Sequence, residues 1–170
     1  VIADSNRIYV GAQAEIGYFE PDKNGRLQYT SLNHLIPDTE KDFADVWDVV
    51  LHGQDVFFRS FKRIFQLKNG KISVYSDLSW AYLGASNDKL IAQNYANGLL
   101  LFKEGRWRPL LRNNTIPYNA QVASIVPLAQ DSLLVLIKRY GSFILANDTL
   151  VPFNTPGMQT IAAQNPYAAT

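Results

Sequence analysis

The chain has 170 residues, of which 47% are hydrophobic and 18% are charged, and its formal net charge is +1. This composition supports a packed core and excludes a disordered chain, while the balanced charge gives no electrostatic case for binding nucleic acid or an anionic membrane. The absence of cysteine excludes disulfides, thiolate catalysis and Cys-ligated zinc.

Short strands are predicted in four successive groups of four, from apolar and aromatic runs bounded by turn residues. The first group is expected near 1–3, 7–12, 15–20 and 26–31. The second is expected near 46–51, 55–60, 63–68 and 71–75. The third is expected near 80–85, 89–93, 98–103 and 106–111, and the fourth near 121–128, 132–138, 141–146 and 149–152. The one helical turn predicted lies at 37–43, where Asp38, Thr39 and Glu40 can open a short helix.

The four groups form an internal repeat. In each group a turn leads into the last strand, and these closing turns are Gly25, Gly70, Gly105 and Asp148, spaced 45, 35 and 43 residues apart. Four short strands every ~40–45 residues is the period of a β-propeller blade. The predicted fold class is therefore all-β, with about four β-propeller blades of four antiparallel strands.

We predict a single β-propeller segment over 1–170. Its blades are expected at 1–36, 43–77, 79–112 and 120–153, with 157–170 starting a further blade. Four blades are few for a closed propeller, so we expect a fragment of a larger one. The two open blade faces would be apolar, and such surfaces rarely stay bare. Either the remaining propeller blades or a second chain, as a homodimer, is expected to cover them.

The stretch 8–19, which reads Ile-Tyr-Val-Gly-Ala-Gln-Ala-Glu-Ile-Gly-Tyr-Phe, resembles the two-component regulator propeller repeat. That repeat centres on an aromatic residue, a Gly-Thr pair and a Gly-Leu pair. Gly11 matches its first glycine, whereas Ala12 replaces the usual threonine and Tyr18 replaces the usual leucine. The third copy keeps the Gly-Leu pair at 98–99.

Residues 10–65 resemble the sensor propellers of large membrane regulators in the Bacteroidetes. The matching features are an Ile-Gly-Tyr-Phe strand at 16–19, a Ser-Leu loop with acidic residues at 31–42, and Val46-Trp47. In that family a membrane helix and then a histidine kinase or DNA-binding domain follow the propeller. The resemblance implies a periplasmic location, as the extracytoplasmic part of an inner-membrane protein, and it implies ligand sensing. It carries no catalytic residues, cofactor or metal ligands.

The expected function is thus that of a non-catalytic, ligand-sensing segment of a signal-transduction receptor. The resemblance makes a saccharide the expected ligand class. Long connections between blades, at 33–42 and 113–119, gather on one face of a propeller, where binding is usual. The candidate ligand-binding residues near that face are Asp45, Trp47, Tyr95 and Tyr118. The alternatives are a protein-binding scaffold or adhesion propeller and a glycan hydrolase or lyase.

Other chemically suggestive residues have simpler structural interpretations. His34 and His52, the only histidines, are expected in exposed turns, because a metal or nucleophile site needs converging ligands. The acidic residues of 38–48 lack the regular spacing of a calcium loop, and sequence cannot set two of them at a catalytic separation. A solvated loop is the expectation.

Two further groups are expected to be structural. Arg59, Lys62 and Arg63 lie among phenylalanines, a mixture that can bind single-stranded nucleic acid, but they surround a predicted hairpin turn. Trp47 and Trp80 begin innermost strands and are expected to pack between blades.

Overall fold

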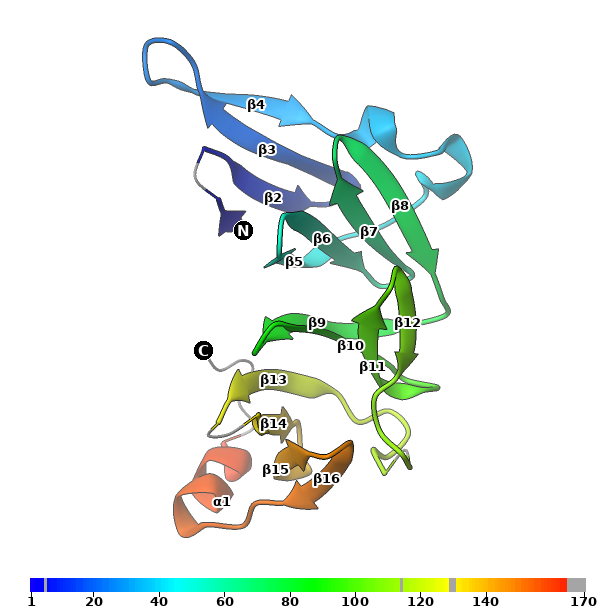
Figure 1. Cartoon of the computed structure of the whole chain (residues 1–170), viewed down its shortest axis with the longest axis vertical. Helices are drawn as coiled ribbons and strands as arrows, with labels where there is room; N and C mark the ends of the chain where they lie inside the picture. The colour runs from blue at the N-terminus through cyan, green and yellow to red at the C-terminus, as the bar shows by residue number, and fades with distance from the viewer. Residues whose placement is uncertain (5, 114, 129–130, 165–170) are drawn as a thin grey trace. The chain divides into compact units, whose positions relative to one another are not determined.

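The computed structural model describes residues 1–4, 6–113, 115–128 and 131–164. Its strands form four antiparallel sheets, in each of which four strands follow one another in chain order (Figure 1). The first sheet contains β1 (Ile2–Ala3), β2 (Ile8–Ala12), β3 (Glu15–Pro21) and β4 (Leu27–Ser31). The second contains β5 (Val46–His52), β6 (Asp55–Ser60), β7 (Arg63–Lys68) and β8 (Lys71–Ser76).

The third sheet contains β9 (Trp80–Ser86), β10 (Lys89–Asn94), β11 (Gly98–Lys103) and β12 (Arg106–Pro109). The fourth contains β13 (Val122–Pro127), β14 (Leu133–Ile137), β15 (Gly141–Ala146) and β16 (Thr149–Pro152). Each sheet lies inside one of the four ranges expected for a blade. The prediction of an all-β fold built from four-stranded antiparallel sheets is confirmed.

Turn chemistry explains the tight hairpins. Asn69 and Gly70 have φ angles of 48° and 71°. Glu104 and Gly105 have φ angles of 53° and 74°. At 147–148, the Asn-Asp pair has φ of 48° and 60°. Two successive positive φ angles define a turn whose twist matches that of the flanking strands, and glycine, asparagine and aspartate tolerate this backbone best. The sequence therefore fixes where these strands reverse.

Helical structure agrees with the predictions in one place and departs from them in two. The predicted turn within 37–43 forms as the 3₁₀ helix η2 (Asp38–Glu40), and a second one, η1 (Asn33–Leu35), precedes it. After the fourth sheet the chain forms the helix α1 (Pro156–Ala163). No strand begins between residues 157 and 164, where a further blade was expected to start, and 165–170 lie outside the described residues.

The chain divides into two compact units, Val1–Leu83 and Gly84–Thr170. The core of the first unit joins side chains of its two sheets with those of the connection between them. Its buried members are Tyr9, Ile16, Tyr18, Leu32, Ile36, Phe43, Val56, Phe58, Phe65 and Leu67. The connection 32–43 thus contributes apolar side chains to the core, and only its polar part is the solvated loop expected.

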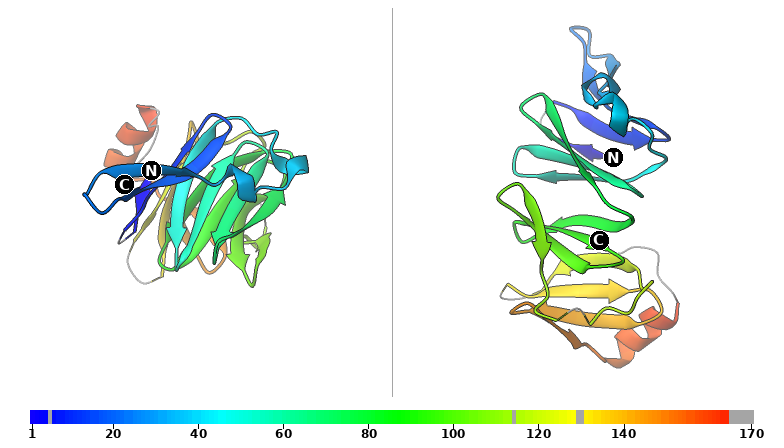
Figure 2. Two further views of the ribbon diagram at one scale, coloured as in Figure 1. Left: turned by 90° about the horizontal axis from the view of Figure 1, so that it is seen from above. Right: turned by 90° about the vertical axis from the view of Figure 1, so that its right-hand side faces the viewer.

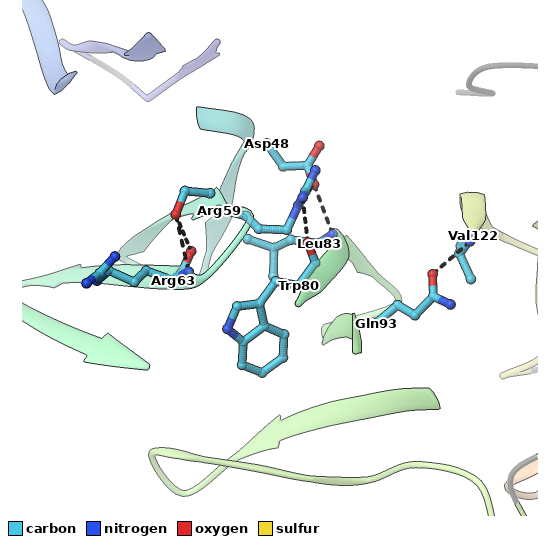
Figure 3. Close-up of polar contacts among 8 residues, drawn as sticks. Asp48, Arg59, Arg63, Trp80, Leu83, Gln93 and Val122 are labelled. Atoms are coloured by element: carbon cyan, nitrogen blue, oxygen red, sulfur yellow. Dashed lines mark hydrogen bonds and ion pairs between the residues drawn. The ribbon is translucent and has the colours of Figure 1, made fainter. Parts of the chain in front are cut away.

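Two polar side chains tie β-strands together in the interior (Figure 3). Arg59 on β6 is 7% exposed, forms an ion pair with Asp48 on β5 and donates from Nη1 to the carbonyl of Trp80, 2.9 Å away. The same carboxylate accepts the N–H of Leu83 at 3.0 Å. In the second unit, Gln93 on β10 accepts the N–H of Val122 at 2.8 Å.

Helix α1 packs on one face of the fourth sheet (Figure 2). A small cavity of about 80 Å³ lies between them. Its walls are almost entirely apolar and comprise Ser124, Val126, Leu134, Leu136, Ser142, Met158 and Ile161. In the part of the chain that the structure describes, no helix has the length and apolar character needed to cross a membrane.

Candidate functional site

The first unit contains a cleft of about 510 Å³. Its walls come from β2, β3, β4 and η1, and from β6, β7 and the two hairpin turns at one end of the second sheet. The lining residues are Arg7, Tyr9, Tyr18, Thr30, Leu32, His34, Leu35, Gln54, Val56, Leu67, Asn69 and Gly70. Clefts of 300–1,000 Å³ that combine aromatic surface with a few polar groups are typical of small-molecule sites.

A tyrosine pair forms the aromatic wall of this cleft. Tyr9 and Tyr18 face each other across β2 and β3, and their ring centroids lie 5.8 Å apart in an edge-to-face arrangement. Tyr9 also packs edge-to-face on Phe58, at 6.4 Å. The two tyrosines are only 5% and 9% exposed. Because sheet pairing and core packing hold both rings, this wall is pre-organised.

A cation lies over that wall. The guanidinium carbon of Arg7 is 4.2 Å from the centroid of the Tyr18 ring, within the range of a cation–π interaction. Nε of Arg7 donates to Glu20 Oε2 at 3.0 Å. Burial alone would lower the pKa of Arg7, but hydrogen bonds with Glu20 and Tyr9 raise it above its ordinary value. The guanidinium group of Arg7 at the rim of the cleft is therefore charged, and it is paired with the carboxylate of Glu20.

Four further polar side chains line the cleft: those of Thr30, His34, Gln54 and Asn69. The last three are exposed, and within the described residues none of the four side chains has a hydrogen-bond partner. They offer hydroxyl, imidazole and amide groups to a ligand. Among the described residues no carboxylate lines the cleft, so this part of the chain does not supply it with the paired acids of a glycosidase.

A second cavity, of about 430 Å³, lies in the second unit. It is lined by Asn119 and Gln121, which precede β13, and by the hairpin residues Lys138, Arg139 and Tyr140. All five side chains carry polar groups, two are cationic and none is acidic. This cavity is thus chemically unlike the tyrosine-walled cleft of the first unit.

The four predicted ligand residues are divided between the units. Asp45 is exposed and forms an isolated antiparallel bridge with Gln13, and Trp47 on β5 is 59% exposed. In the second unit, Tyr95 is half-buried and Tyr118 is 75% exposed. None of the four lines either cavity, although Tyr118 directly precedes Asn119 in the chain.

The tryptophans correct one expectation. Trp80 is buried, at 2% exposure, and its Nε1 donates to the carbonyl of Tyr75 at 3.2 Å. The prediction that Trp47 packs between blades was wrong, because this side chain is largely exposed. The bulge in β5 between Val46 and Asp48 changes the register around Trp47, and a bulge re-aims a side chain.

The charged clusters have structural partners. Arg63 pairs with Glu40 at 2.7 Å and also donates to the carbonyl of Asp42. The hydrogen bonds of Glu40 with Arg63 and Ser76 lower the pKa of this carboxyl. Asp38 pairs with Lys41 at 2.6 Å, and this hydrogen bond lowers its pKa likewise. The carboxylates of Asp38 and Glu40 are therefore held in ion pairs, and no cluster of three potential metal ligands occurs among the described residues.

Sequence reasoning did not find the cleft in the first unit. Tyr9 and Tyr18 were assigned only to strands, and Arg7 only to the first repeat. A signal was present, since Arg7, Tyr9 and, on the next strand, Tyr18 fall on one face of an alternating pattern. The turn residues Gln54 and Asn69 became recognisable only when the second sheet brought two separate hairpins to the same cleft.

Comparison with solved structures identifies the fold. The chain is similar to the extracellular domain of a candidate hybrid two-component system from B. thetaiotaomicron, with a TM-score of 0.61 and 16% identity over 89% of this chain and 21% of that one. It is similar to PorZ, a surface component of the type-IX secretion system of Porphyromonas gingivalis, with a TM-score of 0.62 and 14% identity over 91% of this chain and 22% of that one.

A third similar structure is the WD40 β-propeller domain of Doa1, with a TM-score of 0.61 and 12% identity over 89% of this chain and 52% of that one. The four sheets are therefore blades of a β-propeller fold, as predicted. The chain spans only about a fifth of the first two neighbours' length. At these identities the similarity defines the fold alone. No family model matches the sequence, and no curated protein matches it significantly.

Proposed function

We propose that this chain is a ligand-sensing segment of an extracytoplasmic propeller in a signal-transduction receptor. The observation that carries the proposal is the cleft of the first unit, where a held tyrosine pair and a permanent cation meet unpartnered polar side chains. The similarity to the extracellular domain of a candidate two-component system supports the proposed class and location. Signal relay would then pass through blade packing to other domains.

A saccharide is the proposed ligand class. Sugar rings pack on aromatic surface, and their hydroxyls pair with amide, hydroxyl and guanidinium groups of the kinds present in the cleft. The absence of paired carboxylates from the described lining of the cleft favours binding without cleavage. Asp45, Trp47, Tyr95 and Tyr118 remain proposed contacts outside the two cavities, with Trp47 and Tyr118 exposed enough to stack on a longer glycan.

The test is a thermal-shift screen of the chain against neutral and charged oligosaccharides, followed by titration of any hit. A ligand that binds only the native state raises the melting temperature with dose. The double variant His34→Ala/Gln54→Ala should weaken binding by about tenfold, the effect of losing about 1.4 kcal/mol, since both exposed side chains line the cleft. Gln28→Ala, at an exposed position of β4 outside the cleft, should bind normally. Equal binding by both would place the ligand elsewhere.

The second candidate function is protein binding through an outer strand. β4 is the edge of the first sheet, and its side chains Leu27 and Tyr29 are exposed. Exposed edges with apolar side chains can pair with a partner strand. If no oligosaccharide shifts the melting temperature, a Leu27→Lys variant that loses a protein partner would favour this function.

A further inference from the structure

We propose that the cavity of the second unit binds the oxyanion group of a small hydroxylated ligand, such as a sugar acid or a sugar phosphate. This inference deepens the proposed function and rests on it for the sugar-like part of the ligand. The oxyanion part of the proposal does not depend on the proposed function, because it rests on the residues that line the cavity.

The lining supplies charge of one sign. Lys138 and Arg139 are consecutive residues of the turn between β14 and β15, and both line the cavity, whose described lining residues include no acidic side chain. Arg139 is exposed, and among the described residues it forms no ion pair. Guanidinium and ammonium groups bind oxyanions through charge-assisted hydrogen bonds, which are the stronger kind.

The neutral residues complete the site. The amides of Asn119 and Gln121 provide donors and acceptors for hydroxyl groups, and the ring of Tyr140, which is half exposed, offers a face for a sugar ring. Nζ of Lys138 donates to Oε1 of Gln121 at 3.0 Å, so a neutral amide helps to hold this ammonium group at the cavity.

The segment that carries Asn119 and Gln121 is rigidly held. Gln93, buried at 1% exposure, donates from Nε2 to the carbonyl of Ala120 at 2.5 Å and accepts the N–H of Val122 at 2.8 Å (Figure 3). The N–H of Lys138 bonds to the carbonyl of Gln121 at 2.8 Å. One wall of the cavity is thus fixed to the other before any ligand arrives, which reduces the entropy lost on binding.

The turn geometry allows a clean test. Arg139 has φ of 66°, a conformation that asparagine tolerates better than arginine does. Arg139→Asn therefore removes the charge without straining the turn. The matched control is Arg106→Gln, which removes an exposed arginine from the same unit outside the cavity.

Isothermal titration of the whole chain would compare glucuronate, glucose 6-phosphate, glucose and inorganic phosphate. We expect the two charged sugars to bind, uncharged glucose to bind at least tenfold more weakly, and added salt to weaken the binding of the charged ligands. The preferred charged sugar tells a carboxylate ligand from a phosphate ligand. Arg139→Asn should reduce affinity at least tenfold, whereas Arg106→Gln should leave it unchanged.

The other possible results of the titration either support the oxyanion site or contradict it. Inorganic phosphate that binds as tightly as the sugars would support the oxyanion site and remove the sugar-specific part. Equal binding of glucose and glucuronate, or equal losses in the two arginine variants, would overturn the proposal. The His34→Ala/Gln54→Ala variant separates the two cavities, because it should weaken only ligands of the first unit.

Discussion

Arg59 and Gln93 occupy the same position in successive blades and perform the same task. Each is the last residue but one of the second strand of its sheet, and each is buried and bonded to backbone groups at the beginning of the next blade's first strand. Arg59 bonds to Trp80, the first residue of β9, and Gln93 bonds to Val122, the first residue of β13. The last residue but one of the second strand thus binds the first strand of the following blade in both cases.

The first blade has no polar side chain at this position. The equivalent residue of β2 is Gly11, and the first residue of β5 is Val46. A Cβ atom on Gly11 would lie 2.3 Å from Cγ1 of Val46, so the bare backbone of Gly11 accommodates the valine side chain. In the fourth blade the equivalent residue is Leu136, which faces the small cavity beneath α1.

Loss of Arg59 should be strongly destabilising. Arg59→Met leaves the carboxylate of Asp48 and the carbonyl of Trp80 without this donor. Breaking a fully buried ion pair from one side costs about 3–5 kcal/mol. Because the side chain of Asp48 is 28% exposed, we expect a loss at or below the lower end of that range, which urea denaturation of the variant would measure. The double variant Asp48→Asn/Arg59→Met should recover part of this loss, because no uncompensated charge is left.

The control for this measurement is Arg108→Gln. Arg108 pairs with Glu104 at 2.7 Å on the surface, where both side chains are exposed. Such pairs contribute less than about 1 kcal/mol. If Arg59→Met and Arg108→Gln lowered the free energy of unfolding equally, the buried link at Arg59 would have no special role.

Replacing the amide of Gln93 by an apolar group or by a carboxylate should lower the stability of the fold in both cases. Gln93→Met removes the partners of Ala120 and Val122, at about 1–3 kcal/mol for each buried group left unpaired. Gln93→Glu keeps an acceptor for Val122 but buries a carboxylate, whose folded-state pKa is raised by desolvation.

The pH dependence of Gln93→Glu has a definite sign. Stability of this variant should be greatest below the unfolded carboxyl pKa of about 4.3 and should fall as the pH rises through the raised folded-state pKa. Thermal denaturation between pH 4 and 8 would reveal the fall against the parent chain. A parallel pH profile would mean that the substituted side chain reaches water.

Gly11→Ala should destabilise the first unit through a steric clash. The added methyl group would meet Val46 at 2.3 Å, and overpacking of this kind costs about 1–3 kcal/mol. Val46→Ala alone should also destabilise, by loss of buried contacts. In a double-mutant cycle, Val46→Ala should relieve only part of the cost of Gly11→Ala, because Cβ of residue 46 would still lie 2.6 Å from the added methyl carbon. Simple additivity of the two changes would show that the clash is avoided by a backbone shift.

These links explain what the sequence does and does not reveal. The strands and their turns were predictable because apolar alternation and turn pairs such as 69–70 and 147–148 are local signals. The contacts between successive blades were not predictable, because glycine, arginine and glutamine at one repeated position share no chemistry that a comparison of the repeats detects. Helix α1 was missed because a short segment rich in small residues has no clear period. The cleft was missed because it unites residues from separate hairpins.

The phenol group of Tyr29 should ionise at a higher pH than an ordinary tyrosine. Partial burial of the ring, followed by the hydrogen bond from its hydroxyl to Glu15 Oε1 at 2.6 Å, raises the pKa of Tyr29 to about 12. Because the folded-state pKa exceeds the ordinary value of 10, the contribution of Tyr29 to stability is present below pH 10 and is lost as the pH rises through about 12.

Ultraviolet titration would detect this group as a late phenolate. Burial and the charge of Asp55 also raise the pKa of Tyr75, so Tyr29→Phe should reduce the late component without abolishing it. Glu15→Gln should lower the pKa of Tyr29 by removing the charged acceptor. Tyr140, which lies in a turn of the second unit and is half exposed, provides the comparison through Tyr140→Phe, which should leave the late component intact. Loss of that component in Tyr140→Phe would contradict the assignment.

Helix α1 should shield an apolar surface. Ending the chain at Thr155 removes the helix and uncovers the face of the fourth sheet that carries Leu134 and Leu136. Exposed apolar faces promote association, so the shortened chain should bind more of a hydrophobic dye and elute from a sizing column at a larger apparent mass. Leu136→Asn in the shortened chain should reverse both effects, whereas Leu27→Asn on the first sheet should not. If the shortened chain behaved like the parent in both measurements, α1 would not be protecting this face.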